Sequence, residues 1–265
     1  MQAHTFLSAA GLSLLLATAG AQGAIVVTET FDASTDAATG YVHGQGLVEN
    51  ATGFGTGWSG KWRDGTAAGS YITSHQDGVA QGAGTNTRTI FRDIAPDLTS
   101  TGQMWFSLDI KKDNTTSTAS LAFFAAPAGT PPTQAELLWV GSTGGFWRAG
   151  IGGASSTAIV PGAWQTLTGV IDYANDQAVI WVDLTGASYD PATGAATGSV
   201  QSYPFAHTAA IESIRLAKQG STTVQFDNLR IATLSTDLGV ALVPEPSVVL
   251  LGALGGLALI RRRRA

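Results

Sequence analysis

The glutamate side chains are the first candidates for chemistry, because a retaining glycosidase needs two carboxylates about 5 Å apart. Between its two apolar ends the chain has four glutamates, and no two of them lie within six residues of each other: Glu29, Glu49, Glu136 and Glu212. The pair of catalytic glutamates that a single strand would carry is therefore absent. We expect that the protein is not an enzyme, and in particular not a glycoside hydrolase.

Other patterns for catalysis or metal binding are also missing. The chain has no cysteine, which excludes disulfides, thiolate metal sites and cysteine nucleophiles. His43, His75 and His207 are far apart in the sequence and do not form a His-Glu-x-x-His motif. We interpret them as exposed loop histidines.

Two tryptophans stand on the polar side of predicted strands. Apolar and polar residues alternate over residues 104–111 and 178–184, and Trp105 and Trp181 fall among the polar positions. Aromatic faces stack on pyranose rings, so both residues are candidates for glycan binding on a sheet face open to solvent. Core packing, or cover by a loop, is the alternative that the pattern leaves open.

The elements that position these residues are strands. Alternation with a period of two recurs between turns rich in Gly, Asn, Asp and Pro, and no segment shows a convincing helical period. About ten or more such strands over residues 25–240 predict one all-β domain, a two-sheet antiparallel β-sandwich. Residues 185–202 are polar and rich in glycine, which predicts a long loop that is either functional or mobile, and the composition favours a mobile one.

A central hairpin gives this sandwich a family resemblance. Trp164 opens residues 162–172 and Asp172 closes them, and the next strand ends in Trp181-Val182-Asp183. This pattern resembles the central hairpin of laminin-G-like, concanavalin A-like jelly rolls, although Leu184 stands where such domains usually carry Gly. Residues 29–32 and 225–231 resemble their first and last strands.

The jelly-roll resemblance implies one candidate metal site. In this fold class a structural Ca²⁺ often joins the first and last strands, and Ca²⁺ takes six to eight oxygen ligands. Four residues could supply some of those oxygens: Glu29, Asp32, Asp227 and Asn228. A bulge or strand end is the alternative interpretation of Asp227 and Asn228. We expect no required cofactor beyond this possible structural calcium.

The N-terminal segment predicts export. Residues 6–19 form an apolar run with the length of a signal-peptide core, and the small-residue site Ala19-Gly20-Ala21 follows it. We expect residues 1–24 to be a signal peptide, cleaved after Ala21 or Ala24.

The C-terminal segment, residues 243–265, combines three features in order. Pro244-Glu245-Pro246 precedes the apolar residues 248–260, which predict a single short hydrophobic helix, and four stop-transfer arginines follow: Arg261, Arg262, Arg263 and Arg264. The combination resembles the PEP-CTERM sorting signal. The resemblance implies that an exosortase, a membrane protease, recognises Pro244, Glu245 and Pro246.

Charge narrows the choice of partners. Without the terminal arginines and Glu245, the chain carries 10 basic and 18 acidic residues. Phosphate contacts need Lys and Arg, so we expect no nucleic-acid partner. The expected partners are the general secretion machinery, the exosortase, the membrane through the C-terminal helix until processing, and extracellular polysaccharide.

These observations favour an exported, noncatalytic protein of the cell surface or extracellular matrix, sorted through its PEP-CTERM tag. We expect its C-terminus to be inserted in the membrane first, and the protein then to reach the envelope, surface or matrix. Its β-sandwich is expected to bind glycan or another surface protein. Two alternatives stay open, namely a secreted glycan-active enzyme of the jelly-roll class and a purely structural coat protein.

Overall fold

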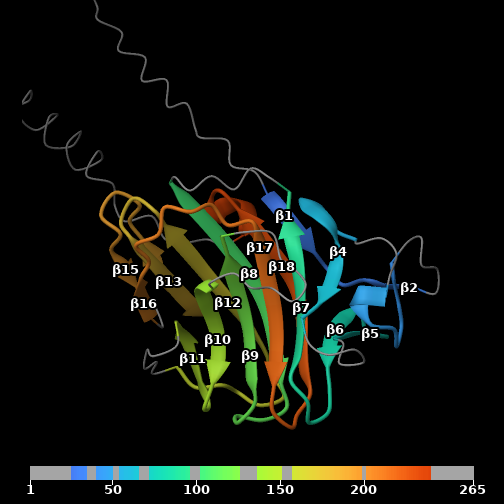
Figure 1. Cartoon of the computed structure of the whole chain (residues 1–265). Coiled ribbons are helices and arrows are strands. Elements are labelled where there is room, and N and C mark those ends of the chain that lie inside the picture. The colour runs from blue at the N-terminus through green and yellow to red at the C-terminus, as the bar shows by residue number, and fades with distance from the viewer. Residues whose placement is uncertain are drawn as a thin grey trace, which may run out of the picture.

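The computed structural model describes residues 25–34, 40–49, 54–65, 72–95, 102–125, 136–150, 157–198 and 201–239. Nearly all regular structure in them is β, in two antiparallel sheets packed face to face (Figure 1). This confirms the predicted two-sheet jelly-roll sandwich. No helix in these residues is long and apolar enough to cross a membrane. The predicted signal peptide and the sorting segment lie outside them.

The larger sheet has eight strands. Their spatial order is β16 (Gln201–Pro204), β13 (Gln177–Val182), β12 (Trp164–Asp172), β8 (Gln103–Lys112), β18 (Val224–Ala232), β6 (Val79–Gly82) and β5 (Thr73–His75). The first strand, β1 (Ile25–Glu29), pairs with β18 beside this path. The predicted hairpin is β12 and β13, in which Asp172 pairs with Gln177.

The smaller sheet has six strands. Their order is β11 (Phe146–Ala149), β10 (Glu136–Thr143), β9 (Thr118–Phe124), β17 (Ser213–Gln219), β7 (Arg88–Ile94) and β4 (Trp58–Asp64). Short elements complete the described chain: the parallel pair β2 (Ala33–Ser34) and β3 (Tyr41–Val42), the hairpin β14 (Ser188–Tyr189) and β15 (Ala196–Thr197), and the 3₁₀ turns η1 (Leu47–Glu49) and η2 (Ser235–Leu238).

The core lies between the two sheets and follows the alternation in β8. Phe106, Leu108 and Ile110 are buried there, and the Phe106 ring lies 5.0 Å from the Phe123 ring of β9 in the opposite sheet. Gly169 on β12 makes room for it, since a Cβ at that position would lie 2.2 Å from the ring of Phe106. The alternation in β8 therefore predicts correctly which of its side chains face the core.

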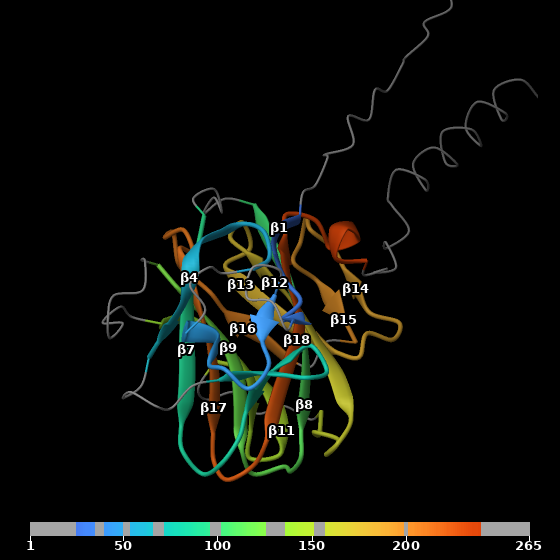
Figure 2. The same ribbon diagram turned by 90° about the vertical axis from the view of Figure 1, so that its right-hand side faces the viewer.

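The prediction of a mobile loop over residues 185–202 is wrong for the residues that the structure describes there. Residues 188–197 form the β14–β15 hairpin, which lies on the outer side of the eight-stranded sheet, away from β7 and β17 (Figure 2). Ala187 and Tyr189 pack onto that sheet, and the Tyr189 hydroxyl donates a 2.5 Å hydrogen bond to Asp172 Oδ2. Apolar contacts and several hydrogen bonds to the sheet, including those of Gln177 and Trp181 to backbone carbonyls of the hairpin, hold this otherwise polar segment in place.

Candidate functional site

The predicted glycan-binding tryptophans are covered. Trp105 is 3% exposed and Trp181 is fully buried, because Tyr189 of the β14–β15 hairpin packs edge-on against both rings. The two indoles stack on each other with centroids 6.0 Å apart. Trp181 Nε1 also donates to the carbonyl oxygen of Thr197, in β15. The prediction that they form an open sugar-binding face is therefore wrong, and the covering loop is what the structure shows.

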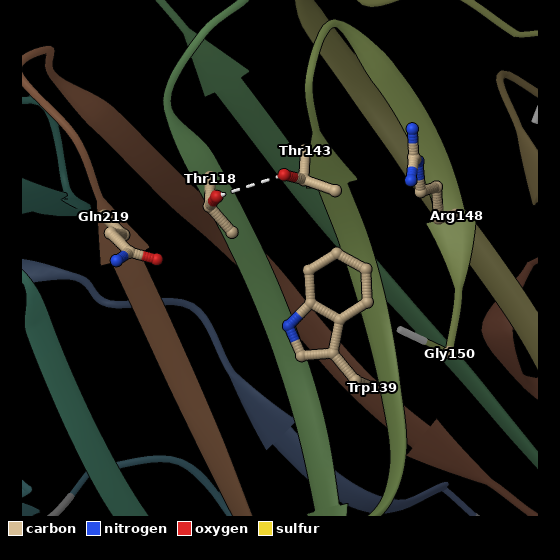
Figure 3. Close-up of a pocket in the computed structure, with 6 residues that line it drawn as sticks. All are labelled: Thr118, Trp139, Thr143, Arg148, Gly150 and Gln219. Carbon is tan, nitrogen blue, oxygen red and sulfur yellow. Dashed lines mark hydrogen bonds between the residues drawn. The ribbon is translucent and has the colours of Figure 1, made fainter. Parts of the chain in front are cut away.

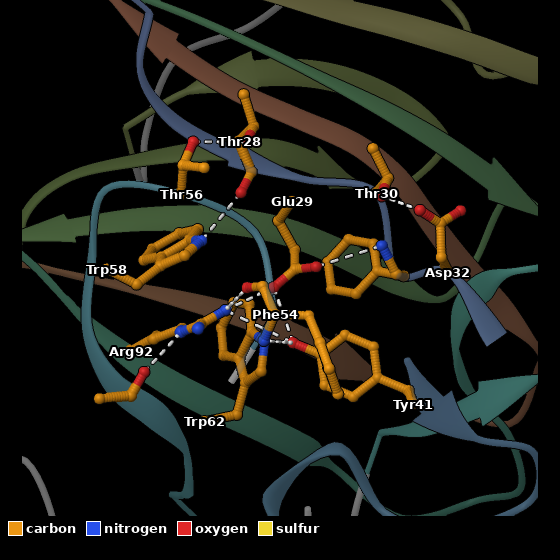
Figure 4. Close-up of polar contacts among 12 residues, drawn as sticks. Thr28, Glu29, Thr30, Asp32, Tyr41, Phe54, Thr56, Trp58, Trp62 and Arg92 are labelled. Atoms are coloured by element: carbon orange, nitrogen blue, oxygen red, sulfur yellow. Dashed lines mark hydrogen bonds and ion pairs between the residues drawn. The ribbon is translucent and has the colours of Figure 1, made fainter. Parts of the chain in front are cut away.

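Glu29 of the predicted calcium set has another role (Figure 4). Its Oε2 forms an ion pair with Arg92 Nη1 at 2.5 Å and accepts a 2.7 Å hydrogen bond from the Tyr41 hydroxyl. Trp62 Nε1 donates to the same oxygen at 3.3 Å. The pKa of Glu29 is raised above its ordinary value, because the effect of burial exceeds the opposing effects of Arg92 and these hydrogen bonds. The calcium assignment of Glu29 is corrected: its carboxylate is fully engaged inside the sandwich.

Of the other three predicted ligands, Asp32 follows β1, and Asp227 and Asn228 lie in β18, the strand that pairs with β1. Asp32 Oδ2 accepts a hydrogen bond from Thr30, and the Asn228 amide donates to Asp109 Oδ2 at 2.9 Å. Burial, together with the negative charges of Asp109 and Asp32, raises the pKa of Asp227 to about 6. Within the described ranges, no group of three or more His, Cys, Asp or Glu side chains could hold a metal ion. The four predicted calcium ligands are thus not assembled as one site.

The histidines are less isolated than the sequence indicates. The rings of His43 and His75 lie 5.9 Å apart, and His75 Nδ1 is 3.1 Å from Asp77 Oδ2. Two segments distant in the sequence therefore bring a histidine pair together.

The side chains best arranged for binding lie elsewhere, on the outer face of the six-stranded sheet. Strand register places them in rows that run across β17, β9, β10 and β11. Ala217, Ser120 and Gly141 occupy one such row, and Arg148 ends it on β11. The first three are small residues, so the middle of this row is low.

Taller side chains stand on both sides of the low row and enclose a hollow. It has a volume of about 230 Å³ and is lined by Thr118, Trp139, Thr143, Arg148, Gly150 and Gln219. We call it the Trp139 hollow. In Figure 3 the indole ring lies between Thr118 and Gln219 on one side and Arg148 on the other. A Cβ at Gly141 would lie 2.2 Å from the carbonyl oxygen of Ala119, so β10 requires glycine there.

The lining combines a small exposed part of the Trp139 indole, which is 9% exposed and packs with Phe91 and Phe124, with several hydrogen-bonding groups. Thr118 and Thr143 place their hydroxyl oxygens 3.5 Å apart at one end, and Gln219 adds an exposed amide. Two polar atoms beneath and beside the hollow are buried without a hydrogen-bond partner among the described residues, Ser120 Oγ and Arg148 Nε. Buried polar groups without partners are uncommon and call for an explanation. A ligand with several hydroxyl or carboxyl oxygens would satisfy this arrangement.

Two ion pairs lie on the same face, one beside the hollow and one on the more distant strands β4 and β7. Arg215 of β17 pairs with Glu136 Oε2 at 2.5 Å, and its guanidinium lies 5.4 Å from the ring centroid of Phe124. Arg63 of β4 pairs with Asp93 of β7. This face therefore carries charged and aromatic side chains together, and the carboxylates of Glu136 and Asp93 come from different strands.

The sequence analysis did not single out the Trp139 hollow. The strands that carry the indole and the two threonines of the lining, β9 and β10, are among the ten or more strands that the alternation predicts over residues 25–240. The available signal was the outward-facing series Trp139, Gly141 and Thr143, with an aromatic and a hydroxyl separated by a glycine. Its partners Arg148 and Gln219 come from strands whose pairing the sequence does not show.

Comparisons with known proteins find the same architecture at low similarity. No family model matches the chain, and no curated protein matches it. A sialidase superposes with a TM-score of 0.45 at 12% identity, over 67% of this chain and 17% of its own. A non-specific endo-β-1,3(4)-glucanase of family GH16 gives 0.44 at 10% identity, over 80% and 91%. The carbohydrate recognition domain of Emp46p gives 0.43 at 9% identity, over 64% and 87%. At these identities the likeness shows the fold alone.

The prediction that the chain is not an enzyme is corrected by the same comparisons. The sialidase, the family GH16 glucanase and a glycosyl hydrolase family protein are among the structures that the chain resembles. The prediction rested on the absence of two glutamates on one strand. Carboxylates can also meet from different strands of a sheet, so spacing along the sequence does not exclude catalysis.

Proposed function

We propose that this protein is an exported, glycan-active jelly-roll protein that engages a polysaccharide chain in the Trp139 hollow. The observation that carries the proposal is the hollow itself, in which the exposed part of a largely buried indole, Trp139 at 9%, lies beside hydroxyl, amide and guanidinium groups. Such a mixture of apolar area and convergent polar groups suits a sugar ring, which has an apolar face and a polar rim.

Hydrolysis of the bound chain is the activity we propose. Glycoside hydrolysis uses two carboxyl groups, one of which acts as an acid. Glu136 on β10, the strand that also carries Trp139, is the proposed acid; Asp93 on β7 lies on the same face but three strands away, too far to act as its partner. Each is paired with an arginine, Arg215 or Arg63, that fixes its position.

The test is a glycan array on the domain of residues 25–240, followed by reducing-sugar release from every glycan that binds. Trp139→Ala is expected to weaken binding by about ten-fold or more, because a central aromatic anchor often dominates a binding site. Glu136→Gln is expected to abolish release while binding persists. Trp164→Ala, an exposed tryptophan of the other sheet, is the matched control. Absence of any bound or cleaved glycan would refute the proposal in favour of a structural coat protein.

We also propose that the protein reaches the surface through its PEP-CTERM segment. The support is the order Pro244-Glu245-Pro246, apolar residues 248–260 and arginines 261–264. In this proposal an exosortase and the general secretion machinery are the processing partners, and extracellular polysaccharide is the glycan that the exported domain meets.

A further inference from the structure

Arg148 is the unusual charge of the outer face. The other arginines described above on this face, Arg63 and Arg215, each form an ion pair with a carboxylate. Arg148 forms no ion pair within the described part of the chain, and its Nε, like that of Arg215, is buried without a hydrogen-bond partner there. It lines the Trp139 hollow together with the indole. A positive group is thus directed at the binding space, although the domain as a whole is acidic.

The chemistry of a guanidinium defines what would satisfy it. Arginine presents its N–H groups as a planar fork that matches a carboxylate with two parallel hydrogen bonds. A buried donor without an acceptor destabilises the protein. A hydrogen bond to a charged acceptor contributes more free energy than one to a neutral acceptor. Arg148 therefore favours a ligand with a planar anionic group.

The rest of the hollow defines the body of that ligand. The exposed part of the Trp139 indole, 9% of its surface, offers an apolar contact to the edge of a sugar ring. The hydroxyls of Thr118 and Thr143 and the Gln219 amide can bind ring hydroxyls. A sugar ring that bears a carboxylate, a uronic acid residue, meets all of these requirements.

We infer that the Trp139 hollow selects acidic glycan, with Arg148 binding the carboxylate of a uronic acid residue that lies beside Trp139. This inference rests on the proposed glycan function and adds the substrate class. The hollow has room for one sugar ring only, about 230 Å³. Arg148 therefore selects for charge on a single sugar unit of the polysaccharide.

The experiment compares oligogalacturonate with its methyl ester, because esterification removes the charge and keeps the ring. Calorimetric titration of wild type should show binding of the free acid about ten-fold or more tighter than of the ester, as hydrogen bonds to charged groups imply. Arg148→Gln should lose this preference and keep the weaker binding of the ester. Lys111→Gln removes the same charge from the opposite sheet and should behave as wild type. A sulfated oligosaccharide tests whether another anionic group is preferred.

The outcomes separate this inference from the proposed function. Equal binding of acid and ester, or an unchanged preference in Arg148→Gln, would overturn the inference. Arg148-dependent preference for the sulfated ligand would overturn the carboxylate assignment. Trp139-dependent binding of neutral glycans alone would overturn the inference and leave the proposed function standing. Absence of binding to any glycan would overturn both.

Discussion

At the scale of single residues, the ion pair between Glu29 and Arg92 joins the two sheets. Glu29 lies on β1 beside β18, and Arg92 lies on β7 of the opposite sheet, where Trp58 and Trp62 flank its guanidinium at 4.6 and 5.6 Å. Both charges are almost fully buried. A buried pair gives little net stability, but its partners depend strongly on each other.

The expected consequence is a large asymmetry between single and double substitutions. Arg92→Met leaves the Glu29 carboxylate buried without its cation and is expected to cost about 3–5 kcal/mol of unfolding free energy at pH 7. Adding Glu29→Gln should recover much of that loss, because no buried charge remains. Urea denaturation of both single variants and the double variant gives the coupling energy. Simple addition of the two losses would contradict the assignment.

Asp227 gives the fold a pH dependence. Burial and the negative neighbours Asp109 and Asp32 raise its pKa to about 6. The protonated form is thus favoured in the folded state, and its stabilisation is present below about pH 4 and is lost as pH rises through about 6. Asp227→Asn should therefore raise the unfolding free energy at pH 7 by about 1–2 kcal/mol, a value reduced for solvent screening, and change little at pH 4.

Thermal melts of wild type and Asp227→Asn at both pH values measure this difference, and equal pH profiles would contradict it. Calcium binding at Asp32, Asp227 and Asn228 stays a prediction. The same melts test it, because a ligand that binds only the folded state raises the melting temperature. Added Ca²⁺ should raise the melting temperature of the wild type more than that of Asp227→Asn, and a chelator should reverse the rise.

At the scale of elements, the alternation in β8 predicts a severe effect of charge in the core. Phe106 is fully buried against Phe123 of the facing sheet. Phe106→Asp is expected to unfold the domain, since a buried charge without a partner is among the costliest substitutions. Phe146→Asp, on a strand of the six-stranded sheet but 40% exposed, is the matched control. A soluble Phe106→Asp variant with an unchanged melting midpoint would refute the core assignment.

The elements also show how far sequence patterns reach. Period-two alternation identifies β8 and β13 and their core faces, because burial of one sheet face imposes that period. It does not predict what covers the other face: Tyr189 lies in a strand of two residues, too short for any periodic signal, and Ala187 lies just before that strand. The Glu29–Arg92 pair and the Trp139 hollow depend on strand order and register between distant segments, which the sequence does not display.

At the scale of the whole molecule, the first strand of the sandwich begins beside the point where the last strand ends. Ile25, where β1 begins, pairs with Ala232, where β18 ends. In the proposed function, residues 1–24 precede this point and residues 243–265 follow it. In this proposal the exported domain is attached to the membrane through residues 243–265, which follow the last strand at the same edge of the sandwich where the first strand begins.

The sorting segment predicts cleavage of that connection. The apolar run has 13 residues, at residues 248–260, and a helix of that length spans roughly 20 Å of a hydrocarbon core of about 30 Å. The four following arginines should stall export with the tail in the membrane. Because proline disfavours helix at and before its own position, we expect Pro244 and Pro246 to leave the motif accessible to a membrane protease. We expect the mature protein, in a host with an exosortase, to end near Pro244.

Mass spectrometry of the C-terminal peptide from surface-extracted protein measures this end directly. Replacing Pro244-Glu245-Pro246 by three alanines should leave an uncleaved form in the membrane fraction, while the wild type moves to the envelope or surface. In the matched control all four terminal arginines are replaced by lysines, which keeps the stop-transfer charge and should therefore still permit cleavage. Recovery of wild-type protein that runs through Arg264 and Ala265 would mean that the segment is a plain anchor, because cleavage anywhere before residue 248 removes both residues.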